Sequence, residues 1–384
     1  MKIIVLGGDG YLGWPTAMHF SDMGHEVMVI DNFAKRQWET EVNVKPLMPI
    51  ATLHERAKVW ERVQGKKIEV KIGDINNHHF LFAAFEKFTP DAVIHYGEQP
   101  SAPYSMIDRG HAVYTQVNNV SSTLNVLFAI KKFNPKCHLV KLGTMGEYGT
   151  PNIDIEEGFI TIEYKGRKDT LPYPKMAGSF YHLTKVHDSH NIHFACRIWG
   201  LRSTDLNQGV VYGIDTPQTV LDKELVTSFH YDEFFGTALN RFLAQAVIGF
   251  PLTVYGKGGQ TRGYLNMVDT LQCVTLAVLN PAKEGEYRVF NQFTELFSVM
   301  DLANITKKCG EKMGLKINIE HFPNPRIESE EHYYNPVHTR LPELGLKPHL
   351  LSDTLINSMF KRIMEHKDNI DTSVIAPTVK WKMN

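Results

Sequence analysis

The sequence predicts an α/β fold, a doubly wound parallel sheet followed by a smaller C-terminal α/β region. Short apolar runs rich in β-branched residues, as at 2–6, 26–30 and 68–72, alternate with helical stretches. The first run leads directly into a glycine-rich turn, Gly7–Gly8–Asp9–Gly10–Tyr11–Leu12–Gly13. Strands that alternate with helices in this way form parallel sheets covered by helices on both faces.

The glycine-rich turn is typical of a dinucleotide-binding site. Gly7, Gly10 and Gly13 allow a tight turn, a close approach of the backbone to a pyrophosphate, and packing of the next helix, expected over 11–23. The second strand ends at Asp31, where a carboxylate can accept the hydroxyls of an adenosine ribose. This acid would repel the 2′-phosphate of NADP, so we predict a Rossmann-type NAD-binding domain over residues 1–210.

Two insertions are expected in this domain, near 33–67 and 150–175. The first contains a helix at 52–63 with Thr52 as its N-cap, and it forms an edge of the active site, a subunit interface or a partner surface. The second contains a hairpin with strands 160–164 and 170–172 around a basic tip. That hairpin is either solvated or a lid over the substrate.

The remaining elements follow in order. Strand 68–72 ends at Asp74, which either contacts adenine or caps the helix 78–88, and strand 91–95 precedes the loop 96–105. A helix centred on Asn118 and strands at 137–142 and 200–205 complete the predicted sheet. Beyond residue 210, helices at 237–249, 267–279 and 298–313 alternate with strands at 252–255 and 287–292. We expect a second domain over 211–384, part of which returns to the first sheet.

Composition is that of an ordinary globular protein. Of the 384 residues, 43% are hydrophobic and 22% charged, and the formal net charge is −1. This balance gives no general attraction for nucleic acid or an anionic membrane. The cysteines, Cys137, Cys196, Cys273 and Cys309, are too widely spaced for a zinc site or a disulfide framework. We expect a cytoplasmic protein with no targeting peptide, membrane span or metal.

A tyrosine and a lysine one helical turn apart are the candidate catalytic pair. Tyr181 and Lys185 share a helix face, where the lysine charge is expected to favour the phenolate and lower the tyrosine pKa. Such a pair also occurs on ordinary solvated helices. The nucleotide-binding turn, together with Thr144 at the end of a strand, favours proton transfer from a sugar hydroxyl beside a nicotinamide.

Longer segments resemble a known family. They are residues 143–149, 181–185, 207–213, 255–264 and 324–326. They are similar to extended short-chain dehydrogenase/reductases that act on nucleotide sugars, and within them to the UDP-sulfoquinovose synthases. The resemblance covers nearly the whole chain, including both insertions. It implies the conversion of UDP-glucose and sulfite to UDP-6-sulfo-6-deoxyglucose and water, with bound NAD as a recycled cofactor.

The chemistry implied by this resemblance begins with oxidation at C4 of the sugar. The oxidation acidifies the C5 proton, and loss of the 6-hydroxyl then gives an enone. Sulfite adds at C6, and C4 is reduced again. Catalysis is assigned to Thr144, Tyr181 and Lys185, with Glu147 and His182 as candidates for proton transfer at C5 and departure of the 6-hydroxyl.

The binding residues are also implied in part by the resemblance. NAD is expected to contact Gly7, Gly10, Tyr11, Leu12, Gly13, Asp31, Asn32, Phe33, Ala34, Asp74, Ile75, Asn118, Tyr181, Lys185 and Val211. UDP-glucose is expected to contact Thr144, Gln208, Ala238, Leu239, Asn240, Arg241, Thr253, Val254, Tyr255, Arg262, Arg326, Ile327 and Glu328. Arg262 is alternatively a structural ion-pair partner of Asp269. A homodimer and a sulfite-donating protein are the expected partners, and the product is expected to serve sulfolipid or sulfated glycan synthesis.

Two departures from related patterns keep alternatives open. Dehydratases carry Thr-Asp-Glu where this chain has Thr144–Met145–Gly146, so a 4,6-dehydratase is disfavoured, whereas a UDP-glucose 4-epimerase needs no such pair. Plant members of the closer family carry an arginine where this chain has Pro100. Another cation must then hold sulfite, and the candidates are Arg109, Lys165, Arg167 and His182. An NAD-binding regulator without activity is the non-enzymatic alternative.

Overall fold

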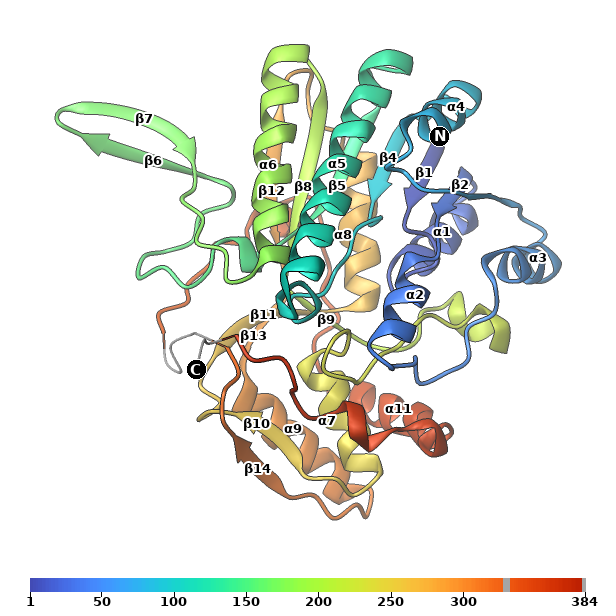
Figure 1. Ribbon diagram of the computed structural model, residues 1–384, viewed down its shortest axis with the longest axis vertical. Coiled ribbons are helices and arrows are strands. Elements are labelled where there is room, and N and C mark those ends of the chain that lie inside the picture. Colours follow the sequence, from blue (N-terminus) through green and yellow to red (C-terminus); the bar gives the residue numbers. More distant parts are fainter. Residues whose placement is uncertain (327–331, 382–384) are drawn as a thin grey trace.

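A parallel sheet of seven strands forms the centre of the molecule (Figure 1). The structure is a computed structural model that describes residues 1–326 and 332–381. The strand order is β12-β8-β5-β4-β1-β2-β3, and every neighbouring pair is parallel. The strands are β1 (Lys2–Leu6), β2 (Glu26–Asp31), β3 (Ile68–Ile72), β4 (Ala92–His95), β5 (His138–Thr144), β8 (Arg202–Gln208) and β12 (Tyr287–Gln292). The predicted doubly wound parallel sheet is therefore confirmed.

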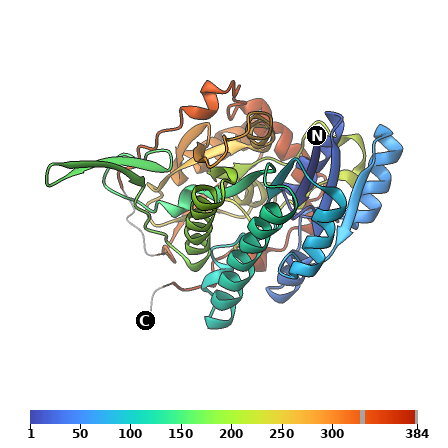
Figure 2. The same cartoon turned by 90° about the horizontal axis from the view of Figure 1, so that it is seen from above.

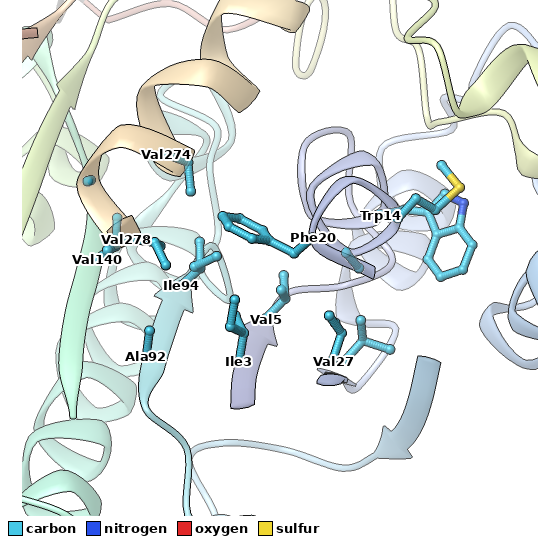
Figure 3. Close-up of a cluster of buried hydrophobic side chains, with 14 of the residues drawn as sticks. Ile3, Val5, Trp14, Phe20, Val27, Ala92, Ile94, Val140, Val274 and Val278 are labelled. Carbon is cyan, nitrogen blue, oxygen red and sulfur yellow. The ribbon is translucent and has the colours of Figure 1, made fainter. Parts of the chain in front are cut away.

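Helices cover both faces because residues along each strand alternate between them. Ile3 and Val5 of β1 pack with Phe20 and with α8 (Figure 3). Ile4 and Leu6 belong to a separate cluster on the opposite face. The first face carries α1 (Gly13–Asp22), α3 (Leu53–Gln64) and α8 (Met267–Leu279). The second carries α4 (His78–Phe88), α5 (Arg109–Phe133) and α6 (Phe180–Trp199).

A smaller lobe lies beside the carboxyl end of the sheet (Figure 1). Its core joins Phe242 and Leu243 to Ile356 and Phe360. The lobe contains α7 (Ala238–Val247), α9 (Val299–Lys312), α11 (Asp353–Met364) and the paired strands β10 (Leu252–Tyr255) and β14 (Ile319–Phe322). A second sheet of three strands joins β9 (Val210–Tyr212), β11 (Thr261–Asn266) and β13 (Glu295–Ser298). The short helix α10 (Arg340–Glu343) packs near β12, which pairs with β8 at the edge of the large sheet.

The insertions take different forms. The first holds two helices rather than one, α2 (Ala34–Glu41) and α3, and Thr52 forms the expected capping box with Glu55. The second holds the hairpin β6 (Phe159–Tyr164) and β7 (Arg167–Pro172), which projects from the side of the molecule (Figure 2). All residues of the hairpin are described, and none of them lines the cleft found at the carboxyl ends of the strands of the large sheet. The structure therefore favours a solvated hairpin over a lid. Within the described ranges, no helix is long and apolar enough to span a bilayer.

Candidate active site

A cleft of about 790 Å³ lies at the carboxyl ends of the parallel strands and against the smaller lobe. Its walls come from the glycine-rich turn after β1, from the ends of β2, β3, β4, β5 and β8, and from α7. This is the edge at which open α/β sheets bind their ligands, because the helix N-termini and the strand ends converge there. The cleft is therefore the candidate active site.

The glycine-rich turn forms one end of the cleft. Gly7 has a φ of +82°, which favours glycine, and a Cβ on Gly13 would lie 2.0 Å from the Gly7 carbonyl oxygen. The two residues let α1 begin directly against the turn, and the residues at its start, Gly10 to Gly13, line the cleft. This cradle fits a pyrophosphate.

Asp31 closes the same end from β2. Its carboxylate accepts hydrogen bonds from the backbone N–H of Asp9 at 2.9 Å and of Phe33 at 2.7 Å. Burial, followed by the nearby Asp9 carboxylate, raises the pKa of Asp31 to about 6. Near pH 6 the Asp31 carboxyl group is therefore present in both its charged and its neutral form.

Asp74 and Asn118 lie on the adjoining wall. Asp74 accepts the backbone N–H of Asn76 at 2.8 Å and lines the cleft, whereas the N-cap of α4 is Asn77. The helix-cap alternative for Asp74 is therefore wrong. Asn118 lines the cleft and accepts a hydrogen bond from the Asn76 amide at 3.2 Å.

Tyr181 and Lys185 project from the first turns of α6 into the middle of the cleft. The Lys185 Nζ lies 5.7 Å from the centre of the Tyr181 ring. It donates to the Leu142 carbonyl at 2.8 Å and pairs with Glu98 at 2.5 Å. Thr144 lies at the end of β5 and lines the cleft as well. The structure thus brings Thr144, Tyr181 and Lys185 into one wall.

The direction of the Tyr181 pKa differs from the sequence-based expectation. Burial raises this pKa above its ordinary value, Glu98 raises it further, and Lys141 lowers it. The expected lowering is wrong for the ligand-free protein, because desolvation of a phenolate outweighs the nearby cation. The phenol is neutral until further positive charge enters the cleft.

His182 lies between the two catalytic candidates and lines the cleft. Its Nδ1 is 2.9 Å from the Ser179 hydroxyl, and Ser179 is also the N-cap of α6. Burial, and then Arg326 and Arg262, lower the pKa of His182 to about 3. His182 is therefore a neutral imidazole and does not supply the positive charge that was expected to hold sulfite.

Glu147 does not reach the cleft. It is fully buried behind Thr144, whose backbone N–H it accepts at 3.3 Å, and it pairs with Lys175. Ser189 of α6 also donates to it at 2.9 Å. Because these partners hold the carboxylate away from the cleft wall, Glu147 supports the turn after β5 rather than contacting a ligand.

The smaller lobe supplies the cationic end of the cleft. Arg241 lies with its guanidinium carbon 4.6 Å from the centre of the Tyr255 ring, and both residues line the cleft. Arg326 lies 5.2 Å from the Trp381 ring centre. Arg262 also lines the cleft, whereas Asp269 pairs with His349 at 2.6 Å. The alternative ion pair between Arg262 and Asp269 is therefore wrong.

Most of the predicted site residues line this one cleft. They are Gly7, Gly10, Tyr11, Leu12, Gly13, Asp31, Asn32, Ala34, Asp74, Ile75, Asn118, Thr144, Tyr181, His182, Lys185, Gln208, Val211, Ala238, Asn240, Arg241, Tyr255, Arg262 and Arg326. Those that do not line it are Phe33, Glu147, Leu239, Thr253 and Val254. Ile327 and Glu328 lie outside the described residues. Pro100 lines the cleft, but the sulfite candidates Arg109, Lys165 and Arg167 do not.

Several cleft residues were not predicted. Glu98 follows β4 and pairs with Lys185, Lys35 follows β2, and Trp381 comes from the C-terminal tail. The position of Glu98 after a central strand was a usable signal, since such loops meet ligands. No local pattern marks Trp381.

The comparisons with known proteins agree with this geometry. Residues 3–291 match the model of the NAD dependent epimerase/dehydratase family. The chain is 60% identical over 381 residues, 99% of its length and 79% of the relative, to the chloroplastic UDP-sulfoquinovose synthase of Spinacia oleracea. It is 44% identical over 385 residues to the UDP-sulfoquinovose synthase of Sulfolobus acidocaldarius, covering 100% of this chain and 98% of that relative.

Solved structures show the same fold. The UDP-glucose 4-epimerase of Bifidobacterium longum, solved in complex with NAD+ and UDP, superimposes with a TM-score of 0.70 at 20% identity. The superposition covers 96% of this chain and 99% of that chain. The chain belongs to the NAD dependent epimerase/dehydratase family, and within that family it groups with the UDP-sulfoquinovose synthases. The resemblance inferred from the sequence is confirmed.

Proposed function

We propose that the protein converts UDP-glucose and sulfite to UDP-6-sulfo-6-deoxyglucose and water. The observation that carries the proposal is the wall formed by Thr144, Tyr181 and Lys185, in a chain 60% identical to a UDP-sulfoquinovose synthase. The wall supplies a proton acceptor, a cation and a hydroxyl at one point of the cleft. These are the groups that oxidation and reduction at C4 of a sugar require.

The residues present fit NAD. The glycine cradle and the start of α1 fit the pyrophosphate, Asp31 fits the adenosine ribose, and Asp74 and Ile75 fit the adenine. Bound NAD would supply a hydride acceptor and, when oxidised, a positive charge. The groups that bind and orient the substrates and transfer protons in the proposed cycle are side chains of the protein.

Tyr181 takes the proton of the C4 hydroxyl and later returns it. Thr144 orients that hydroxyl, and Lys185 stabilises the phenolate with its charge. Burial raises the pKa of free Tyr181, so positive charge added to the loaded cleft would favour the phenolate. Proton removal is thereby coupled to the presence of cofactor.

The smaller lobe anchors the UDP moiety. Arg241 and Arg326 present guanidinium groups to the cleft, and guanidinium groups bind phosphates in a bidentate manner. The rings of Tyr255 and Trp381 lie against these two groups and limit their motion. Arg262 joins them on the same wall.

Sulfite and the sugar C6 meet near His182. With Glu147 held behind Thr144, the neutral His182 is the candidate for proton transfer at C5 and at the departing 6-hydroxyl. Among the described residues, the cleft-lining lysines and arginines are Lys35, Lys185, Arg241, Arg262 and Arg326. The sulfite anion is held by members of this set, since Pro100 carries no charge.

The protein forms a homodimer through α5 and α6. These two helices pack side by side (Figure 1), and several of their apolar side chains are exposed. The exposed residues are Val113, Val117, Leu124, Phe128, Phe180, Leu183, Phe194 and Ile198. An apolar surface of this extent is typical of a subunit interface. Buried free cysteines are consistent with a reducing compartment such as the cytoplasm.

Product analysis tests the proposed activity. The purified protein is incubated with UDP-glucose, with and without sulfite, and the sugar nucleotides are separated by anion exchange. A new, more acidic sugar nucleotide that resists phosphatase and requires sulfite is expected. UDP-galactose alone would favour a 4-epimerase, a 4-keto-6-deoxy sugar would favour a dehydratase, and no reaction would favour a regulator.

A further inference from the structure

A compact group of buried charges lies behind the catalytic pair. Glu98 follows β4, and its carboxylate pairs with Lys185 of α6 at 2.5 Å and with Lys141 of β5. Lys141 pairs on its other side with Asp188 of α6 at 3.0 Å. The four side chains are between 1% and 6% exposed. Buried charges of this kind are costly unless they are paired.

Glu98 determines where the Lys185 ammonium lies. Lys185 donates to the Leu142 carbonyl at 2.8 Å, and the Glu98 carboxylate lies 2.5 Å from the Lys185 Nζ as its ion-pair partner. A lysine ammonium then keeps a further N–H donor for the cleft. Glu98 is itself held by Lys141, by Thr123 at 3.4 Å and by His95 at 3.5 Å.

We propose that Glu98 is a positioning residue for the C4 oxidation and reduction, because its carboxylate keeps Lys185 both in place and protonated beside Tyr181. The proposal rests on the proposed function of the Tyr181–Lys185 pair. The proposal adds the Glu98 carboxylate as the group that keeps the positive charge of Lys185 beside Tyr181. No other carboxylate among the described residues pairs with Lys185.

The electrostatic directions support this geometry. Burial lowers the pKa of Lys185, and the Glu98 carboxylate is the strongest influence that raises it, whereas Lys141 lowers it and Asp188 raises it. For Tyr181, burial raises the pKa, and Glu98 raises it further. Removal of the Glu98 charge therefore lowers the pKa of both members of the pair.

The other charged groups around the pair do not reverse this direction. Burial lowers the pKa of His95 to about 3, so His95 is neutral. Burial, followed by the Glu98 carboxylate, raises the pKa of Asp188, whereas Lys141 and Lys185 lower it. Glu147 and Asp188 raise the pKa of Tyr181, and Lys141 lowers it. Because Glu98 also raises the pKa of Asp188, loss of the Glu98 charge favours an ionised Asp188, which offsets part of the effect on the pair.

The test is the pH dependence of kcat for the full chain with NAD, saturating UDP-glucose and sulfite. Glu98→Gln keeps the shape of the side chain and removes its charge. The whole profile, both its acidic and its alkaline limb, is expected to move to lower pH by at least about one unit. Sulfite titrates identically in both reactions, so the difference between the native and variant profiles comes from the protein.

Three variants control the interpretation. Glu98→Asp keeps the charge, so its profile is expected to stay in place while kcat falls. Asp188→Asn removes a carboxylate that pairs with Lys141 and not with Lys185, and its profile is expected to move less than that of Glu98→Gln. Lys141→Met removes a positive charge and is expected to move the profile to higher pH. This variant provides the test if Glu98→Gln does not fold.

Two results would overturn the proposal. One is a Glu98→Gln profile that coincides with the native profile. If Glu98→Gln does not fold and Lys141→Met does, the corresponding result is a Lys141→Met profile that does not move to higher pH. The other is an Asp188→Asn shift as large as that of Glu98→Gln, since any buried carboxylate would then have the same effect. If the native protein forms no sulfonated product, the proposed function fails instead, so the two failures are distinguishable.

Discussion

At the scale of single residues, Tyr181 has the central chemical role. In the proposed cycle its phenol is neutral in the empty protein, because burial raises its pKa, and the positive charge that oxidised NAD would add favours the phenolate. Lys185 and Glu98 lie directly behind it. Reactivity is thus confined to the state in which the cleft is filled.

Tyr181→Phe removes the proton acceptor and keeps the ring. The expected kcat falls by about 10²–10⁴-fold, the usual worth of a positioned acid or base, while UDP-glucose binding persists. Turnover is measured by product formation and binding by calorimetry. Tyr164→Phe, on the exposed hairpin, is the matched control and is expected to be neutral. Near-native turnover of Tyr181→Phe would refute the assigned role.

Asp31 makes NAD binding depend on pH. The folded pKa of about 6 lies above the ordinary value of an aspartate, so the carboxyl is protonated below about 6 and ionised above it. The ionised form accepts ribose hydroxyls better, so NAD affinity is expected to weaken as pH falls through this value, by up to about tenfold per unit. Calorimetric titration at several pH values measures the effect. Asp31→Asn should bind weakly at every pH, and an equally steep pH dependence in that variant would rule Asp31 out.

At the scale of secondary-structure elements, one buried ion pair joins three parts of the active-site wall. Lys175 comes from the segment before α6 and pairs with Glu147 in the turn after β5. Lys175 also donates to Ser189 of α6 at 2.8 Å. The pair holds the turn that carries Thr144 against the helix that carries Tyr181.

Lys175→Met leaves the fully buried Glu147 without its cation. The expected loss is about 3–5 kcal/mol in the free energy of unfolding, the usual cost of an unpaired buried charge. Urea unfolding followed by circular dichroism measures it. Lys168→Met removes the same charge from the exposed hairpin and should change stability by less than about 0.5 kcal/mol. Equal stabilities of the two variants would contradict the structural role of Lys175.

The elements were predictable because their signals are local. The central strands β1, β2 and β4 are short apolar runs, and the helices at 78–88 and 267–279 match α4 and α8. The site residues at the ends of β2, β3 and β5 were predictable because parallel strands place their carboxyl ends together.

Other features depend on distant parts of the chain. Glu98, Lys141 and Lys185 meet only after β4, β5 and α6 pack together, so their cluster leaves no local pattern. The direction of the Tyr181 pKa depends on burial, which spacing along a helix does not reveal. Trp381 reaches Arg326 from the far end of the chain.

At the scale of the whole molecule, the outer face of α5 and α6 is the proposed dimer interface. Val117 is 62% exposed near the middle of this apolar surface. Val117→Glu is expected to convert a dimer to a monomer, because a charge would be buried in the interface. Light scattering coupled to size-exclusion chromatography measures the mass. Leu171→Glu, at an exposed apolar site on the hairpin, is expected to leave the dimer intact, and a dimeric Val117→Glu protein would exclude this interface.

The most direct test of the account follows one hydrogen through the reaction. The native protein receives sulfite and UDP-glucose that carries deuterium at C4, and the product is examined by mass spectrometry and NMR. The account expects a sulfonate at C6 and deuterium retained at C4, because the same bound NAD removes and restores that hydrogen. An unsulfonated sugar nucleotide as the sole product, or a sulfonated product whose C4 deuterium has been lost, would contradict the account.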